Sequence, residues 1–162
     1  MTKRSISWSD VQSQCDIIVQ QLSHDEIQID TIIGLSRGGL VPATILSHNL
    51  SIREVLVHGY HSYDEDQRIR DPENYHGVMY QDVLYDLMKG ISGKNILIVD
   101  DLCDEGVTMS GLVNRLSGKF HRGVVEFKTA TLYCKDHSSF KPDYVGEHCG
   151  KEWLEFPWEI NI

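Results

Sequence analysis

The sequence predicts an α/β fold, in which helices flank a mainly parallel β-sheet. Two observations support this prediction. Short apolar runs alternate along the chain with segments of helical periodicity, and charged, glycine-containing turns follow two of these runs. Strands that alternate with helices are joined by crossover connections, so neighbouring strands are parallel and both faces of the sheet are covered. With 162 residues the chain suits one domain, 1–162, built around one hydrophobic core.

The first half of the chain opens with a predicted helix. Ser7 followed by Asp10 is typical of a helix N-cap, and apolar residues from Val11 to Leu22 recur at helical spacing. The segments that follow predict a buried strand at 31–35, a helix at 40–50 with a proline in its first turn, and a strand at 55–61.

The second half contains the clearest strand prediction, 95–100, a fully apolar run that ends in an acid. A helix is predicted at 108–116, and further strands at 124–133 and 143–147. These elements continue the alternation of strands and helices that the first half establishes.

A polar segment from about 62 to 93 interrupts this alternation. It is rich in Asp, Glu, Arg and Tyr and only weakly periodic, with residues 79–88 as candidates for a short helix. Loops this long inside compact domains are usually functional or disordered, so we expect a mobile loop. The alternative is a solvated insertion that packs on a neighbouring subunit.

Composition excludes several functions. The formal net charge of −9 argues against a nucleic-acid-binding surface, which needs clustered Lys and Arg. No apolar run approaches the ~20 residues of a membrane span, and the chain starts without a signal-like apolar core. The four cysteines form no CxxC pair. These features predict a cytoplasmic protein.

Zinc binding is an alternative for one group of residues. Cys134, His137, His148 and Cys149 are of the types that bind zinc. Their spacing follows no common zinc motif, so a loop and a strand end with ordinary polar residues are the favoured interpretation.

The stretch from 99 to 108 combines several acidic residues with a glycine-containing turn that leads into a helix. Asp100 and Asp101 follow an apolar run, and Asp104 comes soon after. Adjacent acids are costly to hold together unless a cation or hydroxyl donors meet them. Gly106 then opens a helix with Thr108 in its first turn, which directs free N–H groups at one spot and suits an anion. This combination is what a magnesium-bound sugar phosphate requires; a solvated strand end with a plain helix-entry turn is the alternative.

A second charged turn consists of Ser36, Arg37, Gly38 and Gly39. It matches neither the GxGxxG nor the GxxxxGK[ST] pattern, which excludes dinucleotide and P-loop interpretations. Glycines let the backbone approach an anion closely, and the arginine adds a permanent cation. A common glycine turn between a strand and a helix is the alternative.

The stretch 99–108 resembles the motif by which type I phosphoribosyltransferases bind phosphoribosyl pyrophosphate (PRPP): an apolar strand, two acids, two apolar residues and then acid-x-Gly-x-Thr. The resemblance implies that Asp100 and Asp101 meet the ribose hydroxyls and Mg²⁺. It also implies that Asp104 is the acid/base group facing the purine N7. The residues implied to surround the 5′-phosphate are Asp104, Glu105, Gly106, Val107 and Thr108.

Glu105 departs from the family pattern, because members usually carry Thr or Ser there. A carboxylate beside a phosphate repels it unless the side chain points away. The turn from Ser36 to Gly39 resembles the pyrophosphate loop of the same family, which often contains a cis peptide. The resemblance implies that this loop holds the leaving pyrophosphate.

Residues near the C-terminus resemble xanthine-guanine phosphoribosyltransferases in particular. In those enzymes a lysine like Lys135 donates to the purine O6, and an aromatic residue like Trp153, here followed by Leu154, stacks on the base. The chain also ends in a similar Pro-Trp-acid sequence, 157–159, and Ser62-Tyr63-Asp64 matches the start of the family's mobile loop. By residue type alone, Lys135 could be a solvated loop lysine and Trp153 a packed C-terminal anchor.

The resemblance implies a single type I phosphoribosyltransferase domain with a mobile loop at about 62–93. It also implies a base-binding C-terminal segment at about 135–162 and a small hood. The implied activity is transfer of phosphoribose from PRPP to guanine, xanthine or hypoxanthine in purine salvage, with Mg²⁺ as cofactor, by a homodimer or homotetramer. The alternative is a regulator of the same fold that binds PRPP or a nucleotide without catalysis.

Overall fold

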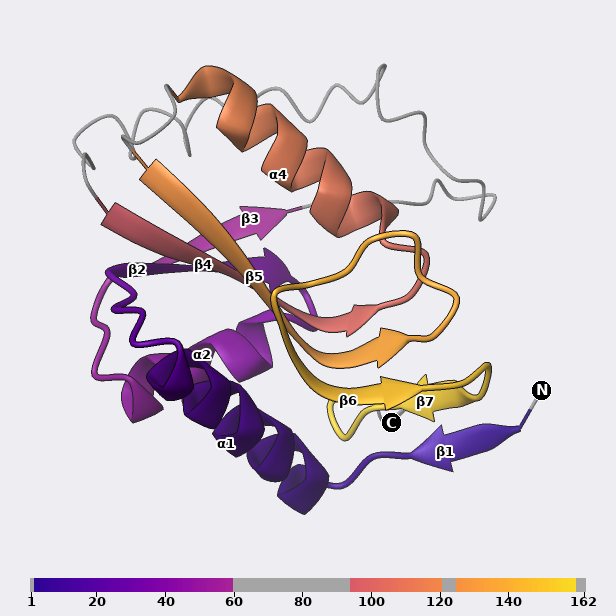
Figure 1. Ribbon diagram of the computed structural model, residues 1–162. Helices are drawn as coiled ribbons and strands as arrows, with labels where there is room; N and C mark the ends of the chain where they lie inside the picture. The colour runs from indigo at the N-terminus through magenta and orange to yellow at the C-terminus, as the bar shows by residue number, and fades with distance from the viewer. Residues whose placement is uncertain (1, 60–93, 121–124, 160–162) are drawn as a thin grey trace.

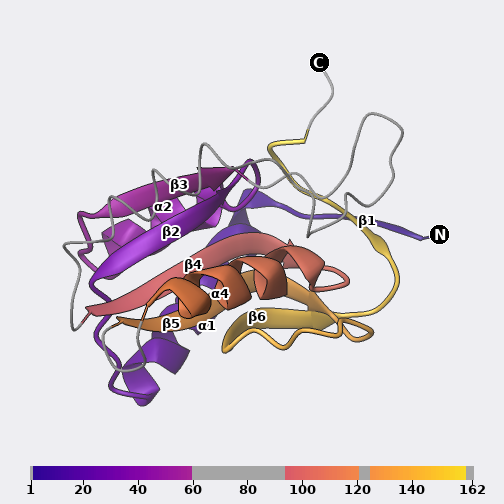
Figure 2. The same cartoon turned by 90° about the horizontal axis from the view of Figure 1, so that it is seen from above.

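The computed structural model describes residues 2–59, 94–120 and 125–159. Its main sheet has five parallel strands, in the order β3 (Val55–Gly59), β2 (Thr31–Ser36), β4 (Lys94–Cys103), β5 (Val125–Lys135) and β6 (Tyr144–Cys149). Helices α1 (Trp8–His24) and α2 (Leu40–Asn49) cover one face, and α4 (Val107–Lys119) covers the other (Figures 1 and 2). The prediction of a mainly parallel sheet flanked by helices is confirmed.

The central strand β4 is buried on both faces. Ile96 and Ile98 pack with Leu112 of α4, whereas Leu97 and Val99 pack on the opposite face, beneath α1 and α2. Successive side chains of a strand point to opposite faces. A continuous apolar run, rather than an alternating one, is therefore what a strand covered on both sides requires.

Helix α1 begins as the sequence predicts. The hydroxyl of Ser7 accepts from the backbone N–H of Asp10 at 3.1 Å, and the Asp10 carboxylate accepts from the Ser7 N–H at 2.8 Å. This reciprocal capping box satisfies two donors that a helix start would otherwise leave unpaired. The apolar stripe that starts at Val11 is buried against the sheet.

The two central strands are longer than the sequence predicts. Strand β4 continues to Cys103 and β5 continues to Lys135, because the ladder between them extends through the pair Cys103–Cys134. The predicted end of this strand at residue 100 is therefore too early: Asp101 also lies within β4, beside Asp100. Backbone pairing with β5 outweighs the low strand propensity of aspartate here.

A small second sheet was not predicted. Strands β1 (Lys3–Ser5) and β7 (Trp153–Glu155) pair in parallel, apart from the main sheet. The guanidinium of Arg4 donates two hydrogen bonds to the Glu147 carboxylate of β6, at 2.5 and 3.0 Å. This bidentate contact attaches the small sheet to the edge of the main one.

Several predictions fall outside the described residues. They are the mobile loop at about 62–93, the short helix at 79–88, the Ser62-Tyr63-Asp64 match and the last two residues of the strand predicted at 55–61. None of the helices in the described ranges is long and apolar enough to cross a membrane.

Candidate active site

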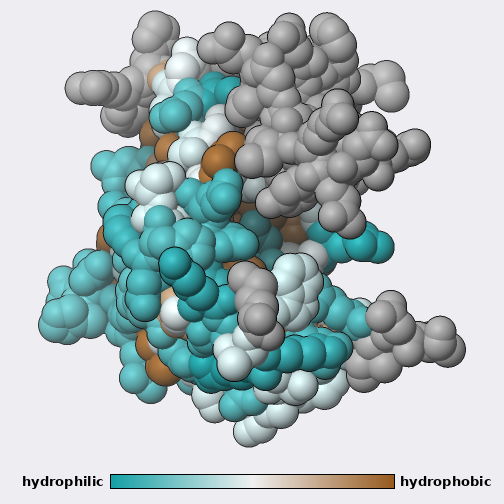
Figure 3. Space-filling view, turned by 90° about the vertical axis from the view of Figure 1, so that its right-hand side faces the viewer, coloured by the Kyte–Doolittle hydropathy of each residue, from teal (hydrophilic) through white to brown (hydrophobic). Residues whose placement is uncertain are grey.

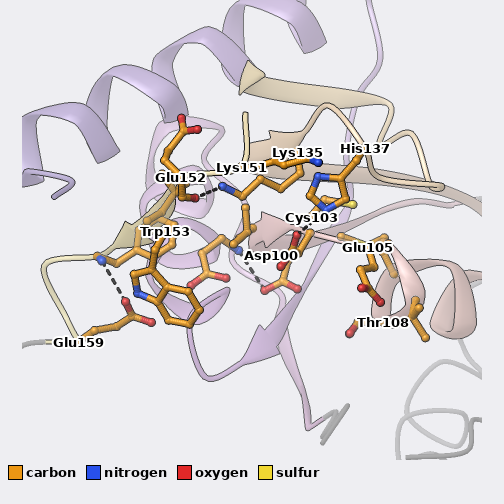
Figure 4. Close-up of a pocket in the computed structure, with 18 residues that line it drawn as sticks. Asp100, Cys103, Glu105, Thr108, Lys135, His137, Lys151, Glu152, Trp153 and Glu159 are labelled. Atoms are coloured by element: carbon orange, nitrogen blue, oxygen red, sulfur yellow. Dashed lines mark hydrogen bonds and ion pairs between the residues drawn. The ribbon is translucent and has the colours of Figure 1, made fainter. Parts of the chain in front are cut away.

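A cavity of about 680 Å³ lies at the carboxyl ends of β4 and β5, where β7 and the start of α4 also meet (Figure 4). The face of the molecule with these strand ends is mostly hydrophilic (Figure 3). The lining includes ten of the residues singled out in the sequence, namely Asp100, Asp101, Asp104, Glu105, Gly106, Val107, Thr108, Lys135, Trp153 and Leu154. Ligands of open α/β sheets bind at such strand ends.

The acid pair forms one side of this cavity. The backbone N–H of Asp101 donates to the carboxylate of Asp100 at 3.0 Å. Burial raises the pKa of Asp100, and the neighbouring charge of Asp101 raises it further. Burial also raises the pKa of Asp101, and the charge of Glu159 adds to this effect. A divalent cation would offset these penalties, and Mg²⁺ usually takes one or two carboxylates from a protein and further oxygens from phosphates. The donor set therefore fits Mg²⁺.

The loop from Ser36 to Gly39 lies directly against the acid pair, although it does not line the cavity itself. A Cβ added to Gly38 would fall 1.7 Å from Oδ2 of Asp101, and one added to Gly39 would fall 2.6 Å from the Val99 carbonyl oxygen. Both glycines are thus required for the loop to pack against β4, a reason that the sequence does not reveal. The Ser36–Arg37 peptide is cis, and the Arg37 side chain is exposed.

The turn before α4 is held from the connection between β5 and β6. Gly106 adopts φ +85°, and a Cβ there would fall 2.4 Å from the Cβ of Phe140. The carbonyl oxygen of Glu105 accepts from both the N–H and the hydroxyl of Ser139, at 3.2 and 2.7 Å. These contacts fix the backbone of the turn while the Glu105 side chain remains exposed.

Asp104 has a partner that the sequence analysis did not assign to it. Its Oδ1 lies 3.0 Å from Nε2 of His137, which also lines the cavity.

In the part of the chain that the structure describes, no group of three or more His, Cys, Asp or Glu could hold a metal ion. Among the described residues, Cys134, His137, His148 and Cys149 therefore form no such group, and His137 lies in the turn after β5 with Asp104 as its partner.

Lys135 is the last residue of β5, whereas the sequence analysis placed it after the strand. Its side chain is buried, with only 4% of the residue exposed, and its ammonium donates to the carbonyl oxygen of Glu152. It is therefore no solvated loop lysine. An ammonium has three N–H donors, so Lys135 can also donate to a partner other than the Glu152 carbonyl.

The two C-terminal tryptophans behave differently. Trp158 stacks on Phe156, with ring centroids 4.8 Å apart and an interplanar angle of 11°. Trp153 is 60% exposed and lines the cavity, while its backbone N–H donates to the carbonyl of Thr2 at 2.8 Å. Trp158 is thus the packed anchor, and Trp153 presents a free aromatic face. Leu154, beside it, is buried at 4% exposure.

Other residues that line the cavity were not predicted from the sequence as site residues. Besides His137 they are Leu102, Cys103, Met109, Lys151, Glu152, Phe156 and Glu159. Most of them lie within two or three residues of a predicted site residue. Their sequence neighbourhood was the available signal, and for Lys151, Glu152 and Phe156 the position also depends on the pairing of the adjacent β7 with β1.

Comparison with known proteins identifies the class of this fold and site. The family model of the phosphoribosyl transferase domain matches residues 7–161, almost the whole chain. The chain therefore belongs to the phosphoribosyl transferase domain family.

Individual relatives agree with this assignment. The chain is 31% identical over 159 residues to a xanthine-guanine phosphoribosyltransferase from Idiomarina loihiensis, covering 97% of this chain and 87% of that protein. It is 33% identical over 132 residues to a protein of the same name from Cereibacter sphaeroides, covering 81% and 70%. The crystal structure of a purine phosphoribosyltransferase from Pyrococcus horikoshii Ot3 superposes with a TM-score of 0.73 at 30% identity, covering 100% of this chain and 97% of that one.

Proposed function

We propose that this protein transfers the 5-phosphoribosyl group of PRPP to a 6-oxopurine, guanine, xanthine or hypoxanthine, in purine salvage. The products are the nucleoside 5′-monophosphate and pyrophosphate. The observation that carries this proposal is the shared cavity, in which a buried Lys135 and an exposed Trp153 face the acid pair of β4. The names of the relatives at 31 and 33% identity support the same substrate class.

The base is proposed to be recognised by the Lys135 ammonium and by the exposed ring of Trp153. The Trp153 ring offers a stacking surface for a planar base. The ammonium of Lys135 can only donate, so it pairs with a 6-oxo group but meets another donor at a 6-amino group. Leaving such a buried polar group without a partner costs about 1–3 kcal/mol, which disfavours adenine. Orotate lacks the purine ring that the Trp153 face suits.

Phosphate recognition divides between two turns. The backbone N–H groups of residues 104–108, at the start of α4, are proposed to hold the 5′-phosphate. The loop from Ser36 to Gly39 is proposed to hold the pyrophosphate, with the exposed Arg37 as its cation. Asp100 and Asp101 would hold Mg²⁺, whose chemistry when bound is to neutralise negative charge on the leaving group.

Asp104 supplies the proton chemistry in this proposal. The bond between the ribose C1 and the pyrophosphate oxygen breaks, with its electron pair leaving on the oxygen, as the purine nitrogen bonds to C1. The proton lost by the purine moves to the Asp104 carboxylate. General acid/base assistance of this kind typically contributes ~10² to 10⁴ in rate.

We also propose, from the family resemblance, a cytoplasmic homodimer or homotetramer. A non-catalytic regulator of the same fold is disfavoured, because Asp104, Lys135 and Trp153 all line one cavity. The test is pyrophosphate release with PRPP and Mg²⁺, with each base supplied alone and a base-free control. Release with the three 6-oxopurines supports the proposal. Release with adenine, orotate or uracil that exceeds all three would contradict it.

A further inference from the structure

The imidazole of His137 contacts the carboxylate of Asp104, the proposed acid/base group. Its Nε2 lies 3.0 Å from Oδ1 of Asp104, with 43% of the His137 side chain and 55% of the Asp104 side chain exposed. Figure 4 shows the His137 ring beside the cavity. A half-exposed carboxylate on a turn would otherwise sample several rotamers. One hydrogen-bond donor at this distance is enough to select one of them.

The backbone around His137 is itself fixed to the turn that carries Asp104. The N–H of Ser138 donates to the carbonyl of Lys135 at 3.0 Å, which turns the chain just after β5. Next along the chain, the N–H and hydroxyl of Ser139 both donate to the carbonyl of Glu105. The imidazole is thus held in place relative to the carboxylate, on a segment that begins with the proposed base-recognition lysine.

We infer that His137 is a positioning residue for Asp104 in the transfer reaction, an inference that rests on the proposed function. The Nε2–H donates to Oδ1 of Asp104, which leaves Oδ2 as the oxygen that receives the purine proton. The same short segment carries Lys135, so a base bound to the lysine meets a carboxylate that is already oriented. Asp104 remains the residue that exchanges the proton.

The first test compares two substitutions in the full-length protein, His137→Ala and His137→Gln. The alanine variant lacks the Nε2–H donor, so the Asp104 carboxylate is no longer held in one orientation. The kcat is expected to fall about 10- to 100-fold, which is typical of a misplaced catalytic group. The KM for PRPP is expected to change little. The glutamine variant can place its amide nitrogen near the former Nε2 position, so it is expected to recover most of kcat.

His148→Ala provides the matched control. His148 is an exposed histidine on the neighbouring strand β6 and does not line the cavity. Its removal is expected to leave kcat unchanged. The melting temperatures of all three variants show whether the fold is retained.

A double-mutant cycle separates positioning from a merely structural role. In an Asp104→Asn background the proton acceptor is already lost, so adding His137→Ala is expected to lower single-turnover rates no further. Equal losses in the two backgrounds would overturn the inference, as would full kcat for His137→Ala in an active enzyme. If the wild-type protein is inactive with every base, the proposed function fails and the inference fails with it. If the wild type is active and only the His137 results disagree, the inference alone fails.

Discussion

Asp101 lies within β4 and Asp104 just after the end of that strand, and their proposed roles differ. Asp104→Ala is expected to lower kcat by about 10² to 10⁴ with a smaller change in PRPP affinity, because its role is in the transition state. Asp101→Ala is expected to weaken Mg²⁺–PRPP binding as well. Steady-state kinetics with calorimetric titration of PRPP measure both effects. Near-full kcat in Asp104→Ala would show that it is not the acid/base group.

Glu105 stands where the resemblance to type I phosphoribosyltransferases leads us to expect Thr or Ser. Its side chain is exposed and lines the cavity, and its backbone is held by Ser139, so substitution should leave the turn in place. Glu105→Thr is expected to tighten PRPP binding about five-fold, because one unit charge near a phosphate contributes about 1 kcal/mol in water. The control is Glu126→Thr, an exposed site at the start of β5. Unchanged affinity would mean that the Glu105 carboxylate does not act on the phosphate.

Among the secondary-structure elements, the small β1–β7 sheet decides where Trp153 lies. Arg4→Met removes the bidentate contact to Glu147 and leaves a part-buried carboxylate without its partner. The free energy of unfolding is expected to fall by about 1 kcal/mol, since both side chains keep solvent contact. The KM for the purine is expected to rise, because β1 holds the backbone of β7. Urea denaturation and base-saturation kinetics measure the two effects.

Lys3→Met is the matched control for Arg4→Met. The Lys3–Glu155 ion pair also starts from β1 but reaches β7 rather than β6, and its side chains are 57% and 36% exposed. No measurable loss of stability is expected for Lys3→Met. Equal destabilisation by the two substitutions would mean that the Arg4 contact does not anchor the small sheet.

The elements also show which parts of the fold could be predicted. The main strands, helices and acidic motif lie in continuous stretches whose periodicity and capping are local, so the sequence is sufficient for them. Strands β1 and β7 have three residues each and pair across about 150 positions, so no local pattern marks them. The ends of β4 and β5 were missed because pairing between strands, which is not local, carries Asp100 and Asp101 into the sheet.

Some features of the candidate site were also expected from the sequence, whereas others became apparent only in the folded structure. The PRPP motif and the role of Lys135 were expected from the resemblance to a known family, but the His137–Asp104 contact joins two connections that only the folded sheet brings together. The packing of Gly38 against Asp101 is equally non-local. What each predicted residue contacts therefore came from the structure alone.

At the scale of the whole molecule, the buried acid pair lowers the stability of the ligand-free fold, and its proposed role is to hold Mg²⁺. Burial and mutual repulsion raise the pKa of Asp100, so its ionised form opposes folding when no cation is bound. Asp100→Asn is expected to raise the free energy of unfolding by about 1 kcal/mol without ligands, and to abolish the stabilisation that Mg²⁺ and PRPP give the wild type.

Thermal unfolding with and without Mg²⁺ and PRPP measures both effects. Asp136→Asn, at an exposed position just after β5, controls for the loss of one negative charge. Stabilisation by Mg²⁺ and PRPP that survives in Asp100→Asn would show that the pair does not hold the ion.

The whole cavity is proposed to hold a 6-oxopurine together with PRPP. The most direct measurement is a competition assay in which guanine, xanthine, hypoxanthine, adenine, orotate and uracil are present together at equal concentration. PRPP and Mg²⁺ start the reaction, and chromatography identifies the nucleotide products, whose ratios equal the ratios of kcat/KM. Monophosphates of guanine, xanthine or hypoxanthine are expected to form almost all of the product, because only these bases combine a 6-oxo acceptor for the proposed contact with Lys135 and a purine ring for the proposed stacking on Trp153. A product that is mainly the adenine, orotate or uracil nucleotide would contradict the account.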